Sequence, residues 1–155
     1  MIRVMKKIAL IALGIFALAL ISFFVYFGIN IYINEAHYDA VLSEGPWSEP
    51  SLWETEDGQA YLLSQDSEEL PFPTVTAHFY YDGEWHSFDA SPRPRSPLLI
   101  FDRTEEDGTT YQHFQAKFRF RRGALIISEL DAWDENSDAP AGTTYKFIRS
   151  DTPQD

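Results

Sequence analysis

The chain contains an uninterrupted run of 27 residues without a charged side chain, from Ile8 to Asn34, and most of this run is apolar. A hydrocarbon core of roughly 30 Å is crossed by about 20 helical residues. Within lipid, every backbone N–H and C=O must be paired inside the segment, and a helix achieves this. We therefore predict a transmembrane helix over residues 8–33 that contacts the lipid bilayer, preceded by a cytoplasmic N-terminus over residues 1–7.

A cleaved signal peptide is the rival interpretation of the same segment. The apolar region of a signal peptide is about 7 to 15 residues long and ends at a cleavage site of small-x-small form. Ala17-Leu18-Ala19 has this form, but the apolar run continues beyond it through Phe27. The length favours an uncleaved signal-anchor that crosses the membrane once.

The charges that flank the run predict its orientation. Arg3, Lys6 and Lys7 precede it, and the next basic residue is Arg93. The positive-inside rule then places the N-terminus in the cytoplasm and the C-terminal domain outside the cell membrane. Beyond the run, 9 basic and 24 acidic residues give a net charge of −15. Such a charge disfavours nucleic acid as a partner, and it also serves simple solubility. A chain without cysteine suits a bacterial envelope better than a eukaryotic secretory route.

The part that follows the anchor has the alternating pattern of β-strands. Apolar and polar residues alternate from residue 114 to residue 121, which is typical of a strand with one buried face. A two-residue turn at Arg122-Gly123 and a returning strand over 124–130 would place Phe120 opposite Leu125. Apolar residues then meet on one face, so pattern and register agree.

A second hairpin is expected around Asp82-Gly83, a dipeptide that favours type I′ turns. Its strands would cover residues 74–81 and 84–89. Further strands are expected at 51–55, 59–64, 97–103, 109–113 (running on into 114–120) and 143–149.

These elements predict an all-β domain of about seven strands over residues 51–150, folded as a small antiparallel β-barrel or as a sandwich. We expect a stalk over residues 34–50 and a disordered tail over residues 151–155. In composition the domain is similar to small lipocalin-like barrels, although no motif carries the likeness. The similar features are the early Trp47, the many aromatic residues and the last strand, 145–149.

The group that most resembles catalytic machinery is His78, Ser87 and Asp89. In the hairpin register above, His78 pairs with Ser87, and Asp89 lies two residues further along the same face. A catalytic triad needs the imidazole between nucleophile and carboxylate, with oxyanion donors near the serine. This register does not provide that order, and we interpret the three residues as a polar, solvated face.

The acidic segment Asp134–Asp138 begins like a calcium loop, with oxygen ligands at alternate positions. Ala139 stands where such a loop requires glycine, and Tyr145 stands where it requires the bidentate glutamate. An acidic surface loop is therefore favoured over a calcium site. The histidines show no spacing typical of a metal site, and no cofactor is expected; these histidines are His37, His78, His86 and His113.

Two further features are candidates for recognition. The segment Ser91–Pro97 is the only basic patch of the acidic domain, and its three prolines favour a stiff connection between strands over a docking segment. Trp85 shares a face with His78 and Ser87, which makes it the best candidate for an exposed aromatic residue, whereas tryptophans of small β domains more often fill the core. The other tryptophans are Trp47, Trp53 and Trp133.

Taken together, these patterns favour a non-enzymatic, single-pass membrane protein that presents a small acidic β domain to an envelope protein or a ligand. The alternatives are a subunit of a larger membrane complex and, less favoured, a hydrolase whose site has no recognisable motif.

Overall fold

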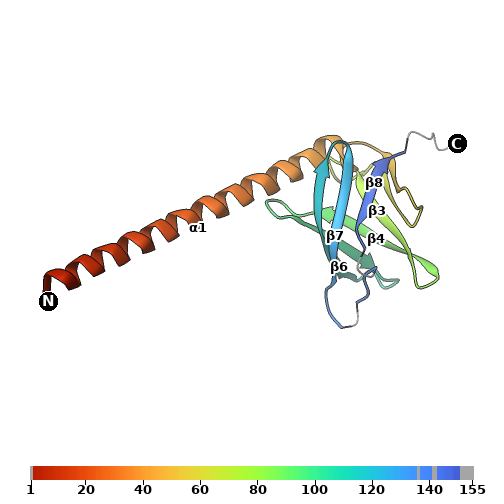
Figure 1. Ribbon diagram of the computed structural model, residues 1–155. Coiled ribbons are helices and arrows are strands. Elements are labelled where there is room, and N and C mark those ends of the chain that lie inside the picture. Colours follow the sequence, from red (N-terminus) through yellow and green to blue (C-terminus); the bar gives the residue numbers. More distant parts are fainter. Residues whose placement is uncertain (1, 136, 141–142, 151–155) are drawn as a thin grey trace. The chain divides into compact units, whose positions relative to one another are not determined.

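The computed structural model describes residues 2–135, 137–140 and 143–150. Its first element is α1 (Ile2–Glu44), one continuous helix that contains the whole uncharged run (Figure 1). This helix is long and apolar enough to cross a membrane. Residues up to Ile33 form one unit of the structure, and residues from Asn34 onward form a second. The side chains from Arg3 to Ile29 are all exposed, so the apolar ones have no protein core to enter.

The second unit is a closed antiparallel barrel in which each strand pairs with its neighbours in sequence (Figure 1). The first and last strands close it, through the pairing of Glu54 with Ile148 and of Thr55 with Phe147. The strands are β1 (Ser51–Thr55), β2 (Ala60–Gln65), β3 (Thr74–Tyr81), β4 (Glu84–Pro92), β5 (Leu98–Thr104), β6 (Thr110–Arg121), β7 (Ala124–Ala132) and β8 (Tyr145–Arg149).

The structure corrects the expected architecture in two respects. The barrel has eight strands rather than about seven, and the sandwich alternative is wrong. Sequence periodicity identifies each strand and its buried face, but it does not say which two edges of the sheet meet. Closure pairs those two edges, and a closed barrel leaves no strand edge exposed to another chain.

Both predicted hairpins are confirmed. The turn residues have positive φ angles, 52° and 84° at Asp82-Gly83 and 52° and 70° at Arg122-Gly123, as a type I′ turn requires. Phe120 lies opposite Leu125, as the apolar pattern predicts.

Aromatic side chains fill most of the barrel. Phe101 and Phe114 stack at a centroid distance of 4.3 Å, and Phe79 contacts both of them edge-on. An eight-stranded barrel has an interior just wide enough for side chains or for one small ligand. The largest fully buried aromatic residues are Trp53, Phe79, Phe88, Phe101, Phe114, Phe118 and Phe147.

Residues 34–50, expected as a stalk, are part of the folded unit in the structure. The helix continues through Glu44, and Val41 and Trp47 are buried in the barrel core with exposed fractions of 0% and 2%. The indole Nε1 of Trp47 donates to the carbonyl of Ala90 at 3.3 Å. Tyr38, Val41 and Leu42 have the i, i+3, i+4 spacing of one helical face. This short pattern follows directly on the apolar run, and the run obscures it in the sequence.

Candidate functional sites

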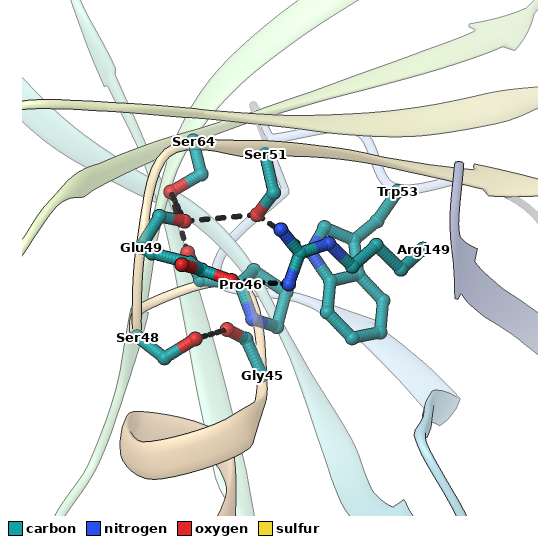
Figure 2. A network of polar contacts seen from close by, with 8 residues as sticks. All are labelled: Gly45, Pro46, Ser48, Glu49, Ser51, Trp53, Ser64 and Arg149. Carbon is teal, nitrogen blue, oxygen red and sulfur yellow. Dashed lines mark hydrogen bonds and ion pairs between the residues drawn. The ribbon is translucent and has the colours of Figure 1, made fainter. Parts of the chain in front are cut away.

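One end of the barrel is closed by Val41, Trp47 and the polar network of the following turn; we call it the capped end. Ser64 Oγ bridges two carbonyls of that turn, donating to Pro46 O and lying 3.1 Å from Glu49 O. Ser51 Oγ donates to the same Glu49 carbonyl at 2.9 Å (Figure 2). Figure 2 also shows the indole of Trp53, which donates to Ser51 Oγ, and the ion pair between Arg149 and Glu49. The polar groups of this turn therefore find partners within the chain.

The helix ends at the capped end because of Gly45. Its N–H donates to Val41 O at 3.1 Å, and Ser48 N donates to Gly45 O at 3.0 Å. A Cβ atom at position 45 would lie 2.5 Å from Val41 O and 2.9 Å from Val41 Cα. These are backbone atoms that cannot move aside cheaply, so the close approach requires glycine.

The opposite end of the barrel carries a chain of polar and aromatic side chains; we call Tyr81, His86, Arg103 and His113 the polar end. The rings of Tyr81 and His86 stack at 3.9 Å. Arg103 Nη2 lies 3.4 Å from His86 Nδ1, and its guanidinium carbon lies 4.7 Å from the centroid of the Phe88 ring. Phe88 also contacts His113, at 5.7 Å between ring centroids. Strands β3, β4, β5 and β6 thus each contribute to this end.

Several buried polar atoms at the polar end have no hydrogen-bond partner among the described residues. They are Tyr81 Oη, His86 Nε2 and His113 Nδ1, together with Gln112 Nε2 beside His113. Buried side-chain polar atoms are paired in the large majority of cases, so a group of four is unusual. Burial raises the pKa of Tyr81 to about 12, which keeps its hydroxyl protonated as a donor.

His113 reaches the polar end through an irregularity that the sequence does not reveal. Phe101 pairs with Phe114, whereas Asp102 pairs with Gln112, so His113 is the extra residue of a β-bulge. Bulges redirect side chains and disturb the simple alternation of faces. The polar end was missed at the level of sequence because its four residues come from four strands, and only barrel closure and this bulge bring them together.

The outer face of β2, β3 and β4 carries an aromatic patch, which we define as Tyr61, His78, Tyr80 and Trp85. Tyr61 stacks on His78 at 4.3 Å, and Trp85 lies 5.3 Å from Tyr61 and 5.5 Å from Tyr80. Trp85 is 49% exposed and Tyr80 is 40% exposed. Burial lowers the pKa of His78, so the patch is uncharged at neutral pH.

The predicted pairing of His78 with Ser87 is confirmed, and Ser87 Oγ lies 2.7 Å from His78 Nδ1. Asp89 pairs across the sheet with Thr76 on one side and Asp102 on the other. The structure therefore brings Ser87 and His78 together but gives Asp89 other neighbours. A serine triad needs a carboxylate that orients the imidazole, and Asp89 does not take that position.

The acidic loop lies partly outside the described residues, because Asn136 is not among them. Ser137 Oγ donates to Asp134 Oδ1 at 3.0 Å, which occupies one carboxylate oxygen within the loop. Within residues 2–135, 137–140 and 143–150, no three His, Asp or Glu side chains are placed to hold a metal ion. The calcium site, which the sequence pattern disfavours, has no geometric counterpart among the described residues.

The remaining candidates from the sequence are the basic segment 91–97, His37 and Trp133, and the structure places each of them. Ser91 and Pro92 end β4, and the rest of the basic segment connects β4 to β5, where Arg95 lies 3.8 Å from Glu35. His37 Nδ1 lies 3.2 Å from Phe120 O at the capped end. Trp133 is 57% exposed.

An apolar groove lies beside the capped end, with a volume of about 230 Å³. Tyr38 and Leu42 from the last turns of α1 form one wall, and Leu70 and Phe72 from the β2–β3 connection line it as well. The last two are 47% and 43% exposed.

No protein-family model, curated protein or solved structure matches this chain.

Proposed function

We propose that this chain is a single-pass membrane-anchored binding protein, with residues 8–33 in the bilayer and the barrel outside the cytoplasm, that captures a partner protein through the aromatic patch. The observation that carries the proposal is an uncharged group of four aromatic rings, two of them exposed (Tyr80 and Trp85), on a domain of net charge −15. Tryptophan and tyrosine are enriched among the residues that dominate protein–protein binding energy. An acidic surface around them would deter non-specific association.

The shape of the patch favours a protein over a small molecule. Small-molecule sites are concave and enclose most of the ligand surface. The aromatic patch lies on the outside of a barrel, which is convex, and its rings are supported by the ladder between β2, β3 and β4. A rigid convex surface with exposed Trp85 suits insertion into a hollow of a partner protein.

Membership of a larger membrane complex is the second candidate function, and the apolar groove favours it. Leu70 and Phe72 leave apolar area open to solvent beside Tyr38 and Leu42. Apolar side chains that are exposed together are typical of surfaces that a partner covers. A hydrolase finds less support, because Asp89 has neighbours other than His78.

The test of the proposed function is affinity capture from native membranes with the full-length protein and two matched tryptophan variants. Trp85→Ala removes the centre of the aromatic patch, whereas Trp133→Ala removes a tryptophan of similar exposure elsewhere on the barrel. We expect a partner that co-purifies with the wild type and with Trp133→Ala, and is lost at least tenfold from Trp85→Ala. Equal recovery with both variants would contradict the proposal.

The orientation is tested separately with protease added to intact cells. We expect cleavage of the barrel in intact cells, because the positive-inside rule places it outside the cytoplasm. Protection of the barrel until the membrane is permeabilised would reverse the orientation, whatever the result of the capture experiment.

A further inference from the structure

The polar end of the barrel offers hydrogen-bond donors that no acceptor in the described chain uses. Arg103 Nη2 is within hydrogen-bond distance of His86 Nδ1, which makes Nδ1 the acceptor and leaves Nε2 to carry the ring proton. Nε2 is one of the buried atoms without a partner. Tyr81 Oη is a second unpaired donor beside the same imidazole, and burial raises its pKa to about 12.

Arg103 is the cation of the polar end, whereas the carboxylates of Asp138 and Asp82 lie near enough to Tyr81 to help raise its pKa. Arg103 forms no ion pair with a carboxylate in the described part of the chain, although acidic residues outnumber basic ones twofold in the whole sequence. Its guanidinium lies instead over the face of Phe88. The carboxylate of Glu84 lies 3.6 Å from His86 Nε2, beyond hydrogen-bond distance, and its side chain is 74% exposed. A half-buried cation with free donors around it is complementary to an anion.

We propose that the polar end binds a small organic carboxylate, with Arg103 as its ion-pair partner and the Tyr81 hydroxyl as a hydrogen-bond donor. A guanidinium and a carboxylate are both planar and can form two parallel hydrogen bonds. A single negative charge also suits the domain better than the double charge of a phosphate, since the domain itself carries −15.

This site is distinct from the aromatic patch. Inward-facing residues at one end of the barrel form it, whereas Tyr61, His78, Tyr80 and Trp85 face outward from β2–β4. Binding of a carboxylate therefore neither requires nor excludes capture of a partner protein. The two proposals fail independently.

The test is calorimetric titration of the full-length protein in detergent micelles with acetate, benzoate, benzamide and inorganic phosphate. Benzamide has the shape of benzoate without its charge, and phosphate is the competing oxyanion. We expect acetate and benzoate each to bind at least tenfold more tightly than benzamide and phosphate. Phosphate as the tightest ligand, or no difference between benzoate and benzamide, would overturn the proposal.

Two variants at the polar end, Arg103→Gln and Tyr81→Phe, test whether the carboxylate binds there, and Arg119→Gln is the control. Arg103→Gln should weaken carboxylate binding at least tenfold, whereas Arg119→Gln, at an exposed position of β6, should leave it unchanged. Tyr81→Phe should weaken binding several-fold without lowering the melting temperature, because the hydroxyl it removes has no partner in the chain. This second variant keeps the proposal falsifiable if Arg103→Gln does not fold.

Carboxylate affinity that is unchanged in both Arg103→Gln and Tyr81→Phe would place the binding elsewhere and overturn the assignment. A crystal structure grown with benzoate that shows only ordered water at Arg103 would overturn it as well, since water alone then serves these donors.

Discussion

At the capped end of the barrel the side-chain donors find acceptors, whereas at the polar end several buried polar atoms have no partner among the described residues. Ser64 serves two carbonyls of the turn after α1, and the indole of Trp47 reaches Ala90 O. At the polar end, Tyr81 Oη and His86 Nε2 are buried and unpaired among the described residues. Unpaired buried polar groups cost stability, whereas paired ones stabilise modestly. The comparison indicates that one end holds the fold together and the other tolerates a cost that a ligand would recover.

The largest effect is expected from Trp47→Ala at the capped end. The side chain is 2% exposed and fills the core beside Val41, so its removal leaves a cavity and frees the Ala90 carbonyl. We expect a loss of about 3–5 kcal/mol in the free energy of unfolding. Denaturant unfolding of the full-length protein in detergent, followed by circular dichroism, measures it.

Trp133→Ala is the control for that measurement, because Trp133 is 57% exposed. A surface substitution should stay within about 0.5 kcal/mol of the wild type. Equal losses for the two variants would mean that the turn after α1 does not contribute to the barrel core.

Gly45→Ala tests whether the tight turn after α1 is a structural requirement. The new Cβ would lie 2.5 Å from Val41 O, so backbone must shift and Trp47 must move with it. We expect a loss of about 1–3 kcal/mol, as for overpacked sites. Gly58→Ala is a poor control because its φ is positive, whereas Gly28→Ala places a Cβ in open space and should leave the unfolding of the barrel unchanged.

Ser64→Ala and Tyr81→Phe compare the two ends directly, since each removes one hydroxyl group. Ser64→Ala leaves the Pro46 carbonyl without its side-chain donor, whereas the Glu49 carbonyl keeps the Ser51 hydroxyl, and we expect a loss of about 1 kcal/mol. Tyr81→Phe removes a hydroxyl without a partner, and the stability of the ligand-free protein should not fall. Thermal unfolding measures both, and a greater loss for Tyr81→Phe would break the comparison.

Alkaline pH should lower the stability of the folded barrel through the Tyr81 hydroxyl at the polar end. The pKa of Tyr81 is raised from 10.0 to about 12 by burial, with a further contribution from Asp138. Between these two values the unfolded chain releases the phenolic proton and the folded chain keeps it, so stability falls as pH rises. The melting temperature between pH 9.5 and 11.5 should therefore decline less steeply in Tyr81→Phe than in the wild type. Identical slopes would contradict the burial of this hydroxyl.

The sequence predicted what depends on local pattern and missed what depends on closure. The apolar helix, both type I′ hairpins and the bounds of β1 and β3 follow from periodicity and turn residues. The pairing of β1 with β8 joins segments about 95 residues apart, and no local pattern encodes it.

The same limit applies to the candidate sites. His78 and Ser87 were placed together correctly, because a two-residue turn fixes their register. His86 and Arg103 lie on different strands, and the bulge that brings His113 towards Phe88 has no signal in the sequence. The burial of Trp47 depends on the direction in which α1 ends, which Gly45 determines through a close backbone approach.

Native-state hydrogen exchange at two matched backbone amides tests the contrast between the ends most directly. Phe118 N donates to Pro97 O at 2.7 Å near the capped end, and Trp133 N donates to His113 O at 2.9 Å at the polar end. If the capped end holds the fold, Phe118 should exchange only through nearly global unfolding, whereas Trp133 should exchange at least tenfold faster through local opening. Equal protection of the two amides, or slower exchange at Trp133, would contradict the account.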